Sequence, residues 1–194
     1  MKPRILCFAG SLRRDSLNKK LVKLAAQAAE DAGAETTVLD LKELSLPIYD
    51  GDIESEEGLP ENAIRLKRLF KEHDGLLIAS PEYNSSISAA LKNAIDWASR
   101  PEPGEGQLEC FTGKVAGLLA ASPGAFGGLR GLVALRSILG NIKVIVIPEQ
   151  FALSQANAAF NEDGSLKDPK HVKAMSAVAV RLTEVTARLN MLEI

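Results

Sequence analysis

Short apolar runs alternate along the chain with longer segments in which apolar residues recur every three or four positions. The short runs predict five strands, over residues 5–9, 36–41, 75–79, 114–121 and 143–147. The longer segments predict helices over residues 16–32, 60–72, from about 86–88 to 98, a segment ending near 140, and 169–190. This alternation is typical of βαβ units and a parallel sheet.

Five strands with interleaved helices predict an α/β fold, a flavodoxin-like three-layer sandwich around a five-stranded parallel sheet of order 2-1-3-4-5. No repeat or linker divides the sequence, so we expect one domain over residues 1–194. The acidic segment 45–60 is expected to be a loop, either mobile or in contact with a partner. Ligands of such folds bind beyond the carboxyl ends of the strands. The loops after strands one, three and four are therefore the candidates for a site.

Composition narrows the classes of function. The formal net charge of −2 argues against nucleic-acid binding, which needs a basic face, and gives no reason to expect binding to an acidic membrane. The longest apolar runs have the length of strands, and the run at residues 5–9 is too short for the apolar part of a signal peptide. We therefore expect a cytoplasmic protein with no nucleic-acid or membrane partner.

The cysteines and histidines form no metal-binding or catalytic pattern. Cys7 and Cys110 lie far apart without CxxC spacing, so neither a disulfide nor a metal site is expected. Cys7 falls in an apolar strand and is expected to be a small buried side chain. His73 and His171 lie among charged residues, and both are expected to be solvated.

The loop over residues 10–18, with the sequence GSLRRDSLN, joins the first strand to a helix N-terminus. Unpaired backbone N–H groups and the helix dipole favour an anion there. Five side chains can donate hydrogen bonds to phosphate oxygens: Ser11, Arg13, Arg14, Ser16 and Asn18. The loop matches neither the P-loop nor GxGxxG and suits a terminal monophosphate, provided that Asp15 faces solvent or caps the helix. The alternative is that Ser16 only caps the helix and that the arginines are surface charge.

Two further loops fall at the same predicted edge of the sheet. In the segment 80–86, SPEYNSS, Tyr83 offers a flat face to an isoalloxazine ring and the nearby backbone amides offer donors. The segment 122–128, SPGAFGG, has three glycines within five residues, which marks close approach of a ligand or of another backbone. Each loop alone is compatible with an ordinary turn, but their conjunction with residues 10–18 indicates a flavin site.

Three sequence blocks carry a resemblance to a known family: GSLRRDSLN at 10–18, PEYNSS at 81–86 followed by LKNAIDW at 91–97, and SPGAFGGLRG at 122–131. Together they resemble the NAD(P)H-dependent FMN reductase family, the flavodoxin-like group that includes chromate and quinone reductases. The resemblance implies bound FMN, NADPH or NADH as co-substrate, and a small-molecule electron acceptor such as a quinone, free flavin, an azo compound or a metal oxyanion such as chromate. No catalytic side chain is expected, because the flavin N5 carries the hydride.

The resemblance also implies cofactor-binding residues: Ser11, Arg13, Ser16, Leu17 and Asn18 at the phosphate, Pro81, Glu82, Tyr83 and Asn84 along the ring, and Ser122 and Gly124 near its edge. Family members usually form homodimers or homotetramers with the helix around residues 91–97 at an interface, so Trp97 is either an interface or a core residue. Ser88 stands where relatives often have proline, and we expect this change to loosen the start of that helix.

Other functions remain open from the residues alone. A flavodoxin-type electron-transfer protein without pyridine nucleotide activity is one alternative, although such carriers tend to be strongly acidic. A regulatory or scaffold domain without a nucleotide is another, because a fold does not fix a function. Arg130 and Arg136 are candidates for contact with a 2′-phosphate, but their positions on a predicted helix do not decide between NADPH and NADH.

Overall fold

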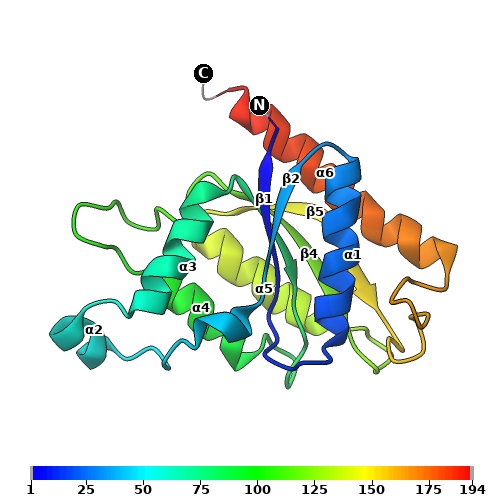
Figure 1. Ribbon diagram of the computed structural model, residues 1–194, viewed down its shortest axis with the longest axis horizontal. Coiled ribbons are helices and arrows are strands. Elements are labelled where there is room, and N and C mark those ends of the chain that lie inside the picture. The colour runs from blue at the N-terminus through cyan, green and yellow to red at the C-terminus, as the bar shows by residue number, and fades with distance from the viewer. Residues whose placement is uncertain (1, 193–194) are drawn as a thin grey trace.

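The protein is built on a five-stranded parallel sheet of order β2-β1-β3-β4-β5 (Figure 1). This computed structural model describes residues 2–192. The strands are β1 (Arg4–Ala9), β2 (Glu35–Leu39), β3 (Gly75–Ala79), β4 (Val115–Ala121) and β5 (Ile145–Leu153). The predicted fold class and strand order are confirmed, and the strand order is that of a flavodoxin-like fold.

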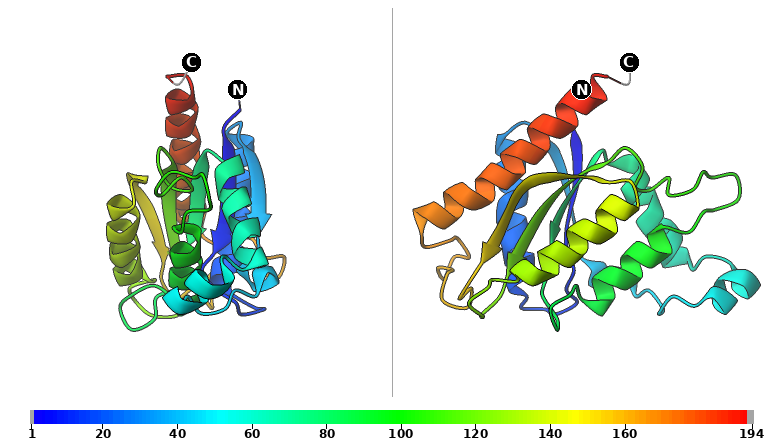
Figure 2. Two further views of the ribbon diagram at one scale, coloured as in Figure 1. Left: turned by 90° about the vertical axis from the view of Figure 1, so that its left-hand side faces the viewer. Right: turned by 180° about the vertical axis from the view of Figure 1, so that it is seen from behind.

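Helices cover both faces of the sheet and give three layers (Figure 2). One face carries α1 (Leu17–Asp31) and α6 (Pro169–Asn190), and the other carries α3 (Glu61–Glu72), α4 (Ala89–Ala98) and α5 (Leu129–Asn141). The connection from β2 to α3 contains a 3₁₀-helix, η1 (Leu41–Leu44), and a short helix, α2 (Gly51–Glu57), that projects from the body of the protein (Figure 1). Among residues 2–192, no helix combines the length and the apolar character that a membrane crossing needs.

The central strands are continuous apolar runs because both of their faces are buried, as β1 illustrates. Ile5, Cys7 and Ala9 belong to the core under α1 and α6. Leu6 and Phe8 belong to the core under α3, α4 and α5. Both faces of a parallel strand are buried, so no polar position interrupts the pattern.

The connection over residues 45–60 was predicted as a loop, but it contains the helix α2. Asp50 caps this helix by accepting a hydrogen bond from the Asp52 N–H at 2.9 Å, and acidic residues in the first turn suit the positive end of the helix dipole. No residue of α2 is buried. The helix therefore has no apolar stripe, and the spacing of apolar residues in the sequence does not predict it.

Strand β5 continues to Leu153, beyond its predicted end at residue 147. The next residue is Pro148, which has no N–H to offer to a ladder and is typical of strand ends or edges. Because β5 is an edge strand, it accommodates this proline where its register with β4 shifts. The Arg136 side chain donates to the carbonyl oxygens of Val146 and Ile147, at 3.3 and 2.9 Å, and so satisfies the irregular segment.

The prediction that both histidines are solvated is wrong. His73 is only 7% exposed. Its Nδ1 lies 2.7 Å from the Leu69 carbonyl oxygen, so Nδ1 carries the proton, and its Nε2 lies 2.7 Å from the Thr37 hydroxyl. The ring thus joins β2 to the end of α3. His171 is half-buried, with its ring 5.9 Å from that of Phe151.

Both cysteines are buried and free, and for Cys7 this burial was predicted. Burial raises the pKa of the Cys7 thiol to about 12 and that of the Cys110 thiol to about 11. Both thiols are therefore neutral at physiological pH.

A cluster of charges fastens the connection between α4 and β4 onto α3. The buried Lys67 ammonium donates to the Arg100 carbonyl oxygen at 2.6 Å and to the Glu105 carboxylate. Lys71 pairs with the same carboxylate, and Glu102 lies 3.2 Å from the Lys67 Nζ. A buried ammonium needs such partners, so these contacts hold the connection in one conformation.

We expect Glu105 to make the stability of the protein sensitive to acid. Burial opposes ionisation of this carboxyl, but hydrogen bonds from Lys67 and Lys71 outweigh it and lower the pKa of Glu105 to about 2, from an ordinary value of 4.5. The ionised group therefore stabilises the fold fully above pH 4.5, and its contribution is lost as the pH falls toward 2. Urea unfolding at about pH 6 and about pH 3 should show a larger loss of unfolding free energy for the wild type than for Glu105→Gln. Equal losses would contradict this role.

Candidate functional site

The loops after β1, β3 and β4 meet at the carboxyl end of the sheet. One cavity there is lined by nine of the eleven predicted residues: Ser11, Arg13, Ser16, Leu17, Asn18, Pro81, Glu82, Tyr83 and Ser122. Asn84 and Gly124 line a neighbouring groove, which shares Glu82 and Ser122 with the cavity. The structure therefore brings the predicted residues together in two adjoining hollows.

The loop over residues 10–18 presents unpaired N–H donors. The Gly10 N–H bonds to the Ala79 carbonyl oxygen at 2.9 Å, which continues the pairing of β1 with β3 by one residue. Within residues 2–192, the N–H groups of Ser11, Leu17 and Asn18 have no acceptor. Free donors beside the first turn of α1 are the physical basis of an anion site.

Ser16 caps helix α1, and it also lines the cavity. Its hydroxyl caps α1 by accepting a hydrogen bond from the Lys19 N–H at 3.4 Å. The same residue is buried and lines the cavity. A serine hydroxyl has one proton to donate besides its acceptor lone pairs, so capping leaves Ser16 able to donate to a ligand.

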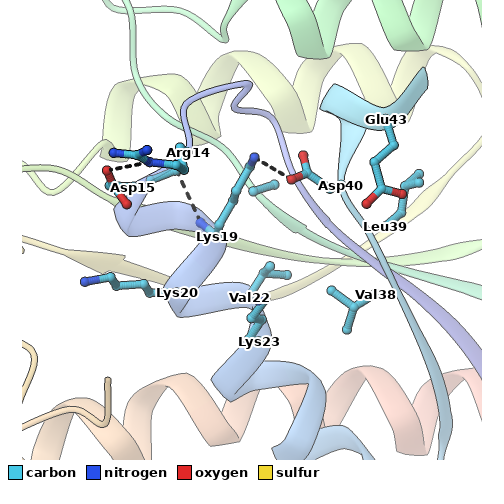
Figure 3. Close-up of a pocket in the computed structure, with 12 residues that line it drawn as sticks. Arg14, Asp15, Lys19, Lys20, Val22, Lys23, Val38, Leu39, Asp40 and Glu43 are labelled. Atoms are coloured by element: carbon cyan, nitrogen blue, oxygen red, sulfur yellow. Dashed lines mark hydrogen bonds and ion pairs between the residues drawn. The ribbon is translucent and has the colours of Figure 1, made fainter. Parts of the chain in front are cut away.

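The charged residues of the loop point to different sides of α1. Arg13 lines the cavity, and its side chain has no hydrogen-bond or ion-pair partner within residues 2–192. Arg14 and Asp15 pair with each other at 3.3 Å, with side chains that are 88% and 76% exposed. Both line a separate cleft between α1 and β2 (Figure 3). Asp15 therefore does not oppose an anion in the cavity, and Arg13 is the arginine that lines it.

The cleft of Figure 3 is more spacious, at about 550 Å³, but it suits a phosphate less well. Four cations line it, Arg14, Lys19, Lys20 and Lys23, together with the carboxylates of Asp15, Asp40 and Glu43. Arg14 pairs with Asp15, and the Lys19 Nζ lies 2.7 Å from the Asp40 carboxylate, so much of this charge is neutralised within the cleft. The cavity at residues 11–18 instead offers unpaired backbone N–H groups at a helix N-terminus, which makes it the better phosphate site.

Asn18 has a task that the sequence did not reveal. Its Nδ2 donates to the Ala121 carbonyl oxygen at 2.9 Å, and its Oδ1 accepts from the Ala121 N–H at 2.9 Å. The side chain is 3% exposed. It ties the start of α1 to the end of β4, and only one Nδ2 hydrogen remains for a ligand. We therefore interpret Asn18 as a positioning residue, whereas the sequence suggested a phosphate donor.

The segment after β3 folds into a tight turn. Tyr83 and Ser86 exchange backbone hydrogen bonds at 2.9 and 3.0 Å, and the two residues between them, Asn84 and Ser85, have φ angles of 50° and 66°. Positive φ at both central positions is typical of a type I′ turn, which favours asparagine at the first of them. The Tyr83 side chain stands exposed beside the turn and offers an aromatic face to a ligand.

Glu82 fastens this turn to α5. Its carboxylate accepts hydrogen bonds from the backbone N–H groups of Arg130 and Gly131, at 3.0 and 3.3 Å, and from the Arg130 Nε at 2.7 Å. Helix α5 begins after Gly128 without a side-chain cap of its own, so Glu82 supplies the cap from a distant loop. Arg130 and Arg136, the two arginines considered for a 2′-phosphate, thus already have partners within the protein, Glu82 and β5 respectively.

The three glycines of the loop after β4 differ in how much space surrounds them. A Cβ on Gly127 would lie 2.7 Å from the Ser154 N, and one on Gly128 would lie 2.8 Å from the Ala120 Cβ. These glycines, which also have positive φ, permit close approach of other parts of the protein itself. A Cβ on Gly124 would meet nothing closer than 3.6 Å, so this glycine leaves room beside the groove.

The sequence made predictions for two residues at helix α4, Ser88 as the cap at its start and Trp97 near its end. Ser88 does not loosen its start: the Oγ accepts from the Leu91 N–H at 3.1 Å, as a helix cap, and donates to the Gly10 carbonyl oxygen. Trp97 is fully buried within this chain, and its Nε1 donates to the Pro47 carbonyl oxygen at 2.8 Å. In the chain as described, Trp97 is a core residue.

Comparisons with known proteins identify the family to which this chain belongs. The family described as NADPH-dependent FMN reductase matches residues 3–158. The chain is 32% identical over 189 residues to a probable NADPH:quinone oxidoreductase 2 from Oryza sativa subsp. japonica, covering 96% of this chain and 90% of that protein. It is 36% identical over 169 residues to an NAD(P)H-dependent FMN reductase from Pseudomonas aeruginosa, covering 86% of each.

The chain is also similar in three-dimensional structure to a solved flavoenzyme. The flavoenzyme NAD(P)H:(acceptor) oxidoreductase FerB from Paracoccus denitrificans superimposes with a TM-score of 0.80 at 32% identity, covering 96% of this chain and 98% of the other. The sheet order, the loops at its carboxyl end and these matches lead to one assignment. The chain belongs to the NADPH-dependent FMN reductase family and is an FMN-dependent oxidoreductase with a flavodoxin-like fold.

Proposed function

We propose that this protein uses FMN, bound at residues 11–18 and the adjoining loops, to pass reducing equivalents from NADPH or NADH to quinones. The observation that carries the proposal is the set of unpaired N–H donors and hydroxyls around a cavity that also reaches the turn after β3. The acceptor class is supported by relatives named quinone reductase from Pseudomonas putida and Escherichia coli, at 36% and 33% identity. Free flavin, azo compounds and metal oxyanions such as chromate are further acceptors to compare.

The residues present fit FMN. The backbone N–H groups of Ser11 and Leu17, the hydroxyls of Ser11 and Ser16 and the Arg13 guanidinium would hold the phosphate. The turn at residues 81–84 would lie along the ring, with Ser122 and Gly124 near its edge. FMN supplies the two-electron chemistry when bound. The chain binds and orients the reactants, and no side chain needs to act as a general acid or base.

We also propose that the protein is one domain that forms a homodimer or homotetramer in the cytoplasm. Several large apolar side chains are exposed in the chain as described, among them Ile48 at 85%, Phe126 and Val133. Burial of these side chains between subunits would remove their apolar surface from water. Light scattering coupled to size-exclusion chromatography tests this assembly.

Anaerobic addition of NADPH to the FMN-loaded protein tests the activity. We expect rapid bleaching of the flavin absorbance and its return when a quinone is added, because the family reduces FMN with NAD(P)H. A mixture of free FMN and NADPH without protein is the control. Protein that keeps its FMN but stays oxidised would indicate a flavodoxin-type electron carrier, and protein that takes up no FMN would overturn the proposal.

A further inference from the structure

The start of helix α4 is packed directly against the loop over residues 10–18. A Cβ on Gly10 would lie 2.8 Å from the Leu91 Cβ, so the loop and the helix touch with no space between them. Ser88 sits at this contact and is 3% exposed. Its hydroxyl makes two hydrogen bonds at once, accepting from the Leu91 N–H and donating to the Gly10 carbonyl oxygen. One side chain therefore caps α4 and holds the first peptide of the loop.

Both polar groups of Gly10 are thereby fixed. Its N–H bonds to the Ala79 carbonyl oxygen on β3, at 2.9 Å, and its carbonyl oxygen bonds to Ser88 on α4. The Gly10–Ser11 peptide is trans, since the described chain contains no cis peptide bond. In a planar trans peptide, the C=O and the N–H point in opposite directions. The Ser11 N–H therefore points away from α4.

This orientation matters because the Ser11 N–H is one of the unpaired donors. Ser11 lines the cavity, and within residues 2–192 its N–H has no acceptor. If the peptide rotated, the Gly10 carbonyl oxygen would turn toward the site and repel a phosphate. A hydrogen bond to that oxygen also polarises the peptide, which makes the attached N–H a stronger donor.

We propose that Ser88 is a positioning residue for FMN, which fixes the Gly10–Ser11 peptide so that the Ser11 N–H faces the phosphate. The proposal rests on the proposed phosphate role of residues 11–18. Ser88 itself does not line the cavity and acts only through this peptide.

The test compares FMN with riboflavin, which lacks the phosphate. Apoprotein is titrated with each flavin and the quenching of flavin fluorescence gives both Kd values. We expect Ser88→Ala to weaken FMN binding by about tenfold and to leave riboflavin binding unchanged. Ser88→Thr keeps the hydroxyl and should bind both flavins as the wild type does. If Ser88→Ala does not fold, Ser88→Gly carries the same expectation, because glycine is tolerated as a helix cap.

Asp168→Ala is a matched control for lost capping. Asp168 caps α6 by accepting from the Lys170 N–H at 2.8 Å, and it lines neither hollow of the site. This variant should lose stability while both Kd values stay unchanged. Equal weakening of FMN and riboflavin in Ser88→Ala, or no weakening of either, would overturn the role of Ser88. A wild type without any preference for FMN would instead overturn the phosphate role of residues 11–18.

Discussion

Arg13→Ala is expected to weaken FMN binding by about 1.5–3 kcal/mol, or roughly 10- to 100-fold in Kd, which is the range for a lost hydrogen bond to a charged group. Arg13 lines the cavity and, within residues 2–192, no carboxylate neutralises it. Its guanidinium is therefore free to make charge-assisted hydrogen bonds to a phosphate. Titration of the apoprotein with FMN measures the effect, and an unchanged Kd would exclude the role.

Arg14→Ala is the matched control, because it removes the same charge one residue along the chain. Arg14 is 88% exposed, pairs with Asp15 and lines the cleft of Figure 3 on the other side of α1. Water and salt screen its effect on the cavity, so we expect a change in Kd of about twofold or less. Similar losses in both variants would mean that net charge, and not the position of Arg13, determines FMN affinity.

The parts of the fold that the sequence predicted are those with local signals. Strands β1 and β3 are continuous apolar runs, and Gly33 ends the first helical segment with a φ of 100°. Ser16 lies just before a helical pattern and caps it. Helix α2 has local caps but no apolar stripe, so the periodicity of apolar residues does not predict it.

The site was predicted as a set of residues but not as a set of contacts. The loops meet because parallel strands end at one edge, and strand order alone predicts this meeting. Which donors remain for a ligand depends instead on tertiary partners, such as the Glu82 carboxylate, which binds Arg130 48 residues away. Likewise, Ser88 reaches Gly10 across 78 residues. A sequence pattern identifies polar side chains beside a site, but it does not show which of them the protein itself already uses.

Asn18→Ala tests whether Asn18 serves the protein itself or only a ligand. We expect this variant to be less stable than the wild type even without FMN. The change leaves the Ala121 N–H and C=O without partners in a buried position. An unsatisfied buried polar group costs about 1–3 kcal/mol, so we expect the unfolding free energy of the apoprotein to fall by about 2–4 kcal/mol. Urea unfolding of apoprotein measures this loss directly.

Asn18→Asp divides the two hydrogen bonds. Its carboxylate can still accept from the Ala121 N–H, but its second oxygen would face the Ala121 carbonyl oxygen in a buried position, so at neutral pH we expect a loss of stability at least as large as that of Asn18→Ala. The added negative charge beside residues 11–18 should weaken FMN binding more than riboflavin binding. A residue that only donated to the phosphate would leave the stability of the apoprotein unchanged in both variants. Asn18 instead joins the start of α1 to the end of β4, so the loss should appear before any cofactor is added.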